Sequence, residues 1–72
     1  MSILIKHTLK GEYIELIKLL KYSGIVGTGG EAKMIVDEGE VQVNDQIEHR
    51  KRAKIKVGDK IEVRGHIISV IA

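Results

Sequence analysis

Residues 39–45, GEVQVND, decide the fold when they are taken together with VGDKIEV at residues 57–63. Two valines alternate with polar residues in the first stretch, and this period of two predicts a strand with one buried face. Asn44 and Asp45 tolerate a left-handed backbone, so they predict a tight turn into a return strand at residues 46–48. The second stretch places another turn before a further alternating strand, and the apolar C-terminal run predicts the last one. The C-terminal half is therefore expected to form several short antiparallel strands.

The chain before these strands indicates two helices. Apolar residues at positions 13, 16, 17 and 20 follow the helical period, which predicts a first helix between Gly11 and Ser23 with glutamates at its start. The second helix is expected to begin at Thr28 and to end at Gly39, with residues 32, 35 and 36 buried. A short strand at residues 3–5 precedes both. A strand, two helices and then several strands predict an α+β domain.

The start of the second helix, Thr28-Gly29-Gly30-Glu31, has the spacing of a capping box. The Thr28 hydroxyl is expected to accept from the Glu31 N–H, and the Glu31 carboxylate to accept from the Thr28 N–H. Two glycines in a first turn each cost about 1 kcal/mol relative to alanine. We infer that something requires bare backbone at this helix start. A phosphate suits such a position, but a helix that is simply capped by Glu31 explains it as well.

The composition limits the class of protein. A chain of 72 residues fits a single domain, here residues 1–72, with a thin core. No cysteine is present and the histidines lack metal-ligand spacing, so no disulfide, metal or other cofactor is expected. Two tyrosines are the only aromatic residues, which argues against a surface that stacks bases on several rings. The apolar run at residues 3–5 is too short for a membrane span, so we expect a cytoplasmic protein without a membrane partner.

Charge is sharply divided along the chain. Residues 37–48 hold five acids and no lysine or arginine, whereas residues 49–56, HRKRAKIK, hold five lysines and arginines and no acid. Such a cluster favours a partner of opposite charge, although a solvated loop is the plainer interpretation. In an extended segment Arg50 and Arg52 would share a face, and arginine forks suit phosphate oxygens. Ile55 is expected to anchor the segment in the core.

These patterns together resemble the S4-type RNA-binding domain, and the likeness runs without a gap from residue 15 to residue 63. The family pattern has a leucine-rich helix before a glycine, then an alanine, then "I-x-x-G-x-V-x-V-N-G" and finally "V-x-x-G-D-x-I-x-V". The residues that match it are Leu16, Leu20, Gly24, Ala32, Ile35, Gly39, Val41, Val43, Asn44, Val57, Gly58, Asp59, Ile61 and Val63. The resemblance implies an alpha-L fold with a core motif of about residues 12–63, and small stand-alone bacterial members look most similar.

The chain also departs from the family pattern. The usual arginine at the start of the first helix falls on Glu15, and a Ser-Arg pair falls on Thr28-Gly29. The turn glycine falls on Asp45. Two cations that commonly contact RNA in the family are therefore missing. The basic run lies where other cations would be needed to replace them. We expect the positive surface of this chain to lie on the segment after the hairpin rather than on the helices.

The resemblance implies a non-catalytic module that binds RNA, in particular structured ribosomal RNA or ribosome-associated particles. No nucleophile motif or acid–base constellation in the sequence indicates an enzyme. The residues expected at the RNA are Thr28, Gly29, Gly30, Lys33, Asn44, Asp45, Gln46, His49, Arg50, Lys51, Arg52 and Lys54. Lysines and arginines would contact phosphates, and amides at the hairpin tip would contact 2′-hydroxyls or base edges.

Plainer interpretations stay open for each group. Residues 44–46 can be only a hairpin tip, and His49 can be an ordinary surface histidine. The alternative function is that of a protein-binding adaptor that uses the acidic residues 37–48. We expect a monomer in either case.

Overall fold

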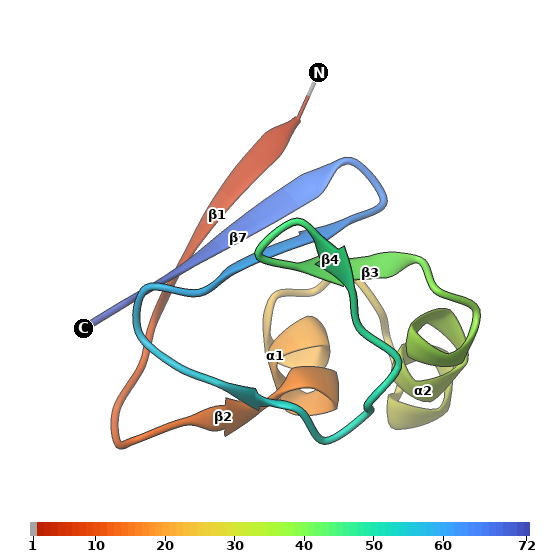
Figure 1. Cartoon of the computed structure of the whole chain (residues 1–72), viewed down its shortest axis with the longest axis horizontal. Coiled ribbons are helices and arrows are strands. Elements are labelled where there is room, and N and C mark those ends of the chain that lie inside the picture. Colours follow the sequence, from red (N-terminus) through yellow and green to blue (C-terminus); the bar gives the residue numbers. More distant parts are fainter. Residues whose placement is uncertain (1) are drawn as a thin grey trace.

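The computed structural model describes residues 2–72 as a sheet with helices packed beneath it (Figure 1). No helix in this range is long and apolar enough to cross a membrane. The α+β class expected from the sequence is confirmed. The elements in chain order are β1 Ile3–Thr8, β2 Ile14–Glu15, α1 Leu16–Tyr22, α2 Gly29–Asp37, β3 Val41–Val43, β4 Gln46–Ile47, β5 Lys54–Ile55, β6 Lys60–Val63 and β7 His66–Ile71.

The larger sheet has the strand order β1-β7-β6-β3-β4 and is mixed rather than wholly antiparallel, which corrects the sequence-based expectation. β1 runs parallel to β7, with Ile3 opposite His66 and Thr8 opposite Ile71. The remaining neighbours are antiparallel. A parallel pair needs a long crossover, and here nearly the whole domain lies between the two strands. The first strand of the chain thereby pairs with the last.

The first helix begins later than the apolar spacing predicted. Ile14 and Glu15 form strand β2, which pairs with Ile55 and Lys54 of β5 in a separate small sheet. The helix therefore starts at Leu16, and no acidic residue occupies its first turn. The prediction of a helix from just after Gly11 was wrong because pairing with a distant strand outweighs the local period.

The second helix has its expected start, with one difference in the cap. The Thr28 hydroxyl accepts from the Glu31 N–H at 3.1 Å, as predicted. The Glu31 carboxylate, however, accepts from the Gly27 N–H at 3.3 Å and not from that of Thr28. This reciprocal bond still satisfies a donor just before the helix.

The core lies between the helices and the sheet. Among residues 2–72 its buried side chains are all aliphatic, and the largest of them are Leu16, Leu19, Leu20, Ile35, Val36, Val41, Ile55, Ile61 and Ile68. The predicted buried face of α2, formed by Ala32, Ile35 and Val36, is confirmed. Aliphatic burial of this kind is the main source of stability in so small a domain.

The predicted hairpin turn is also confirmed. Asn44 and Asp45 have φ of 51° and 70°, the left-handed pair that matches the twist of two antiparallel strands. Gly39 precedes the hairpin with φ of 76°. A side chain there would also meet the His49 ring, whose Cε1 lies 3.3 Å from the position of a Cβ. Backbone and packing therefore both require glycine at this corner.

Candidate functional site

The basic segment, residues 49–56, runs from β4 to β5 and lies against the start of α1 (Figure 1). The Leu16 N–H donates to the Ala53 carbonyl at 2.9 Å, and the Ile17 N–H donates to the Lys51 carbonyl at 3.2 Å. These bonds satisfy donors that the first turn of a helix otherwise leaves free. The backbone of the segment is therefore fixed on the helix, while Arg50, Arg52, Lys54 and Lys56 are exposed.

The conformation of the segment differs from the expected extended one. The Ala53 N–H donates to the Arg50 carbonyl at 3.2 Å, which closes a turn over residues 50–53. Arg50 and Arg52 thus do not share a face through strand alternation, because the intervening backbone is not a strand. Strand geometry begins only at Lys54, in β5.

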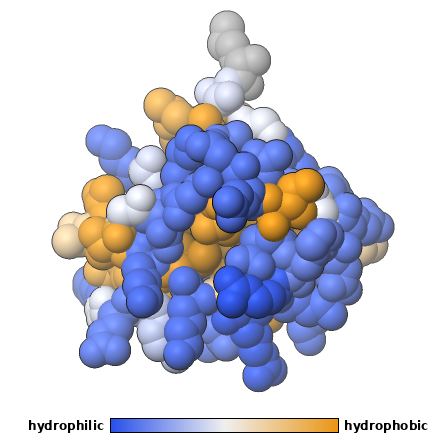
Figure 2. All heavy atoms as spheres, viewed as in Figure 1, coloured by the Kyte–Doolittle hydropathy of each residue, from blue (hydrophilic) through white to orange (hydrophobic). Residues whose placement is uncertain are grey.

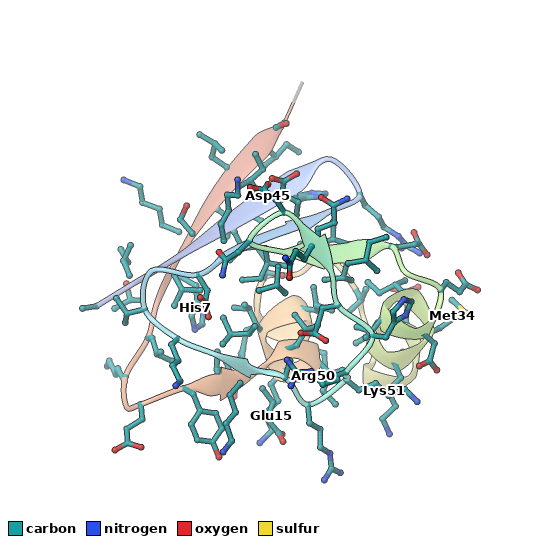
Figure 3. All side chains as sticks on the ribbon, in the orientation of Figure 1. His7, Glu15, Met34, Asp45, Arg50 and Lys51 are labelled. Atoms are coloured by element: carbon teal, nitrogen blue, oxygen red, sulfur yellow. The ribbon has the colours of Figure 1, made fainter. Side chains whose placement is uncertain are left out.

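Two cations of the segment have acidic partners. Arg50 donates through Nε and Nη2 to the Glu48 carboxylate at 3.1 and 3.0 Å. This hydrogen-bonded guanidinium holds the pKa of Glu48 below its usual value. Lys51 Nζ lies 3.1 Å from the carboxylate of Asp37 at the end of α2. Figure 3 shows both side chains on the connector, with Lys51 on the α2 side.

The remaining cations gather around an open hollow of about 520 Å³. Arg52, Lys54 and Lys56 line it, and none of the three has a salt-bridge partner among residues 2–72. Ile55 between the two lysines is only 1% exposed, which confirms it as the apolar anchor of the segment. Lys56 was not among the predicted site residues, although its position beyond the buried Ile55 was a signal for it.

The hairpin tip is tied to the turn before β6. The Asn44 amide oxygen accepts from the Lys60 N–H at 3.0 Å, and its Nδ2 donates to Asp59 at 3.0 Å. Asp45 lies 3.2 Å from Lys60 Nζ. These contacts give a physical reason for an asparagine after β3 and an aspartate before β6. Gln46, at the start of β4, is exposed.

The start of α2 carries four further predicted residues, Thr28, Gly29, Gly30 and Lys33, whereas the predicted His49 lies against Gly39. Gly29 and Gly30 have negative φ, and a Cβ added at either would meet nothing closer than 3.9 Å. The fold itself therefore does not require glycine there. Thr28 and Glu31 cap the helix, and the exposed Lys33 lies one turn further on. Nine residues of helix separate this end from the Asp37–Lys51 contact, or about 13 Å.

The predicted acidic surface is largely neutralised by neighbouring cations. Besides the contacts of Asp37, Asp45 and Glu48, the Glu40 carboxylate accepts from Arg64 Nε at 3.2 Å. That hydrogen bond lowers the pKa of Glu40. Acids that are already paired offer less charge to a partner protein, which weakens the adaptor interpretation. In Figure 2 the face that carries the basic segment is mostly hydrophilic.

Comparisons with known proteins match nearly the whole chain. A family model described as "S4 domain" matches residues 7–71. "Putative RNA-binding protein YbcJ" of Escherichia coli (strain K12) is 40% identical over 63 residues, which are 88% of this chain and 90% of that protein. "Probable ribosome maturation protein RlbA" of Bacillus subtilis (strain 168) is 41% identical over 54 residues, which are 75% of this chain and 76% of that protein. The solution structure of E. coli YbcJ, described as revealing an alpha-L motif involved in RNA binding, has a TM-score of 0.75 at 38% identity. The match covers 100% of this chain and 92% of the YbcJ chain.

Proposed function

The chain belongs to the S4 domain family, and from this premise we propose that it is a non-catalytic RNA-binding module that holds structured RNA on its basic segment. The observation that carries the proposal is the hollow lined by Arg52, Lys54 and Lys56, none of which forms a salt bridge with an acid of residues 2–72. Concentrated positive charge on a fixed backbone suits a polyanion. The name of the relative YbcJ, which describes an RNA-binding protein, also supports the proposal.

Ribosomal RNA is the proposed class of target. The support is the name of RlbA, which assigns that relative to ribosome maturation. We further propose that Gly29 and Gly30 let an RNA backbone approach the start of α2, where free N–H groups attract phosphate. Lys33 would add a point charge at the same end. We expect this binding to take place in the cytoplasm, by a monomer.

Salt dependence provides the direct test, because each neutralised phosphate contributes about 0.9 to the slope of log Kd against log salt. Three unpaired cations therefore predict a slope of roughly 3 for a fluorescein-labelled RNA hairpin. Arg52→Ala should weaken binding and lower this slope by about one. Lys6→Ala removes the same charge from β1, away from the hollow, and is the matched control.

If Arg52→Ala and Lys6→Ala lower affinity and slope equally, only net charge is acting and the basic segment is not the binding surface. Structured RNA should also bind more tightly than an unpaired strand of the same composition, because the segment carries cations and no tyrosine, phenylalanine or tryptophan. Crosslinking in cells, followed by sequencing of the bound RNA, would identify the target. Recovery of ribosomal RNA no more often than its abundance predicts would refute that part of the proposal.

A further inference from the structure

Both tyrosines of the chain line one open hollow of about 850 Å³ beside the basic segment. The hollow lies between the end of β1, the start of α1 and strand β2. Tyr13 enters it from the residue before β2, and Tyr22 from the last residue of α1. Composition alone made base stacking unexpected, because two aromatic rings are few. The fold, however, brings both rings to the same place.

Both tyrosine rings in the hollow are accessible to solvent. Tyr22 is 75% exposed and Tyr13 is 45% exposed, although neither is needed to fill the core. The His7 ring lies 6.4 Å from the Tyr22 ring, centroid to centroid, with 30° between their planes. Figure 3 shows His7 pointing inward from β1 on this side of the molecule. Exposed, adjacent ring faces of this kind are a platform for flat aromatic ligands.

The charge around the rings is mainly positive. Lys10 and Lys18 line the hollow, and Lys21 lines a smaller one that it shares with Lys18 and Tyr22. The carboxylate of Glu15 also faces this region, but it lies 3.7 Å from Lys18 Nζ and is partly neutralised. Cations around aromatic rings match a ligand that alternates flat bases with phosphates.

The hollow adjoins the proposed RNA-binding surface at Lys54. Lys54, which lines the basic hollow, places its Nζ 5.1 Å from the centroid of the Tyr13 ring. Its backbone pairs with Glu15 across β5 and β2. An RNA strand that leaves the basic segment at Lys54 would therefore reach Tyr13 first and Tyr22 next.

We propose that this hollow, which we call the tyrosine groove, binds unpaired RNA nucleotides that extend from the structured RNA held on the basic segment. Bases stack on Tyr22 and Tyr13, while Lys10 and Lys18 contact the intervening phosphates. The inference rests on the proposed RNA binding and adds a second specificity to it: a junction between paired and unpaired RNA. An acidic peptide would satisfy the lysines but would leave the ring faces without a stacking partner.

The test uses three fluorescein-labelled RNA probes with one common hairpin. The first is blunt, the second carries a 3′ extension of about five adenosines, and the third carries an abasic extension of equal length. The expected result is that the adenosine extension tightens binding by about fivefold to a hundredfold over the blunt probe, as one stacked base does. The abasic extension should give a much smaller gain.

Variants then assign the gain to the groove. Tyr22→Ala should remove the gain and leave the affinity for the blunt hairpin unchanged. Leu4→Ala is the matched control, because Leu4 is also 75% exposed but lies on β1 outside the groove. It should retain the gain. Because the chain has only two tyrosines, fluorine NMR of protein labelled with 3-fluorotyrosine should show two signals, and both should shift with the extended probe.

Failure of the groove and failure of the proposed function give different results. If the blunt hairpin binds but the adenosine extension adds nothing, or the abasic extension adds as much, the groove inference is wrong and RNA binding stands. If no hairpin binds but free oligoadenosine shifts the tyrosine signals in a Tyr22-dependent way, the basic-segment proposal is wrong and the groove stands. Equal shifts from polyglutamate would overturn the assignment to nucleotides.

Discussion

Replacing Gly29 and Gly30 with alanine should stabilise the fold and weaken RNA binding at the same time. Both positions have negative φ, and an added Cβ would lie 3.9 Å from its nearest neighbour, Lys21 Cδ for Gly29 and Thr28 Oγ1 for Gly30. Those are ordinary van der Waals contacts, so no strain opposes the substitution. Alanine is better than glycine by about 1 kcal/mol at an interior helix position and by somewhat less in the first turn.

The expected gain for the double variant is therefore about 1–2 kcal/mol, or roughly 5–15 °C in Tm for a domain of this size. Thermal unfolding followed by circular dichroism measures it. Two new methyl groups would also keep a phosphate away from the helix start. A lost charged hydrogen bond costs about 1.5–3 kcal/mol, which is a tenfold or larger rise in Kd for hairpin RNA.

Gly39→Ala is the matched control, because it makes the same chemical change where the structure forbids it. Its φ is 76° and its Cβ would lie 3.3 Å from His49 Cε1, so this variant should lose stability. If the double variant has a Tm no higher than that of the wild type, the claim that Gly29 and Gly30 have room for a Cβ is wrong. A double variant that is more stable but binds hairpin RNA with unchanged Kd would refute close approach of RNA at this helix start.

Three further changes test the ion pairs and the hairpin. Glu48→Gln should release Arg50, raise affinity for hairpin RNA and steepen its salt slope by about one, measured by fluorescence anisotropy; an unchanged slope would contradict this. The Arg50 guanidinium holds the pKa of Glu48 below its usual 4.5, so the pair stabilises the fold at neutral pH. This contribution is lost as pH falls from about 4.5 through the lowered pKa. Urea midpoints of the wild type and Glu48→Gln should therefore differ at pH 7 and converge in acid; a constant difference would exclude the pair as the cause. Asn44→Ala should cost about 2–3 kcal/mol, because it removes two side-chain hydrogen bonds and leaves alanine at φ of 51°. Asn44→Gly, which relieves the backbone strain, should cost about 1 kcal/mol less in urea unfolding, and equal losses would show that strain contributes nothing.

The parts of the fold that the sequence predicted are those with local causes. The turn at Asn44 and Asp45 follows from residues that tolerate left-handed backbone, and the start of α2 follows from the Thr28 cap. The buried Ile55 followed from one apolar residue between lysines. The family resemblance, drawn from the same stretches, is confirmed by the family model and by the relatives. In each case the signal lies within a few residues of the feature it specifies.

The parts that were missed depend on partners far away in the chain. Ile14 lies inside the stretch predicted as the first helix, but it pairs with Ile55, more than forty positions later, and so belongs to a strand. The parallel pairing of β1 with β7 joins the two ends of the chain. The tyrosine groove likewise combines His7 with rings that lie later in the sequence. No local pattern predicts which distant segments meet, because that choice is made by packing of the whole core.

The position of Glu15 shows how the missing helix cation and the basic segment are related. S4-type domains usually carry an arginine there, and a displaced positive surface was expected in its place. The structure pairs Glu15 with Lys54 across β2 and β5, and the carbonyls of residues 51 and 53 accept from the first N–H groups of α1. The cations are therefore distant from the helix start in sequence but adjacent to it in space.

An arginine at position 15 would add like charge beside Lys54, whereas a glutamate offsets part of the repulsion within the segment. The acid at this position is thus consistent with a cationic surface that is supplied by the connector instead of the helix.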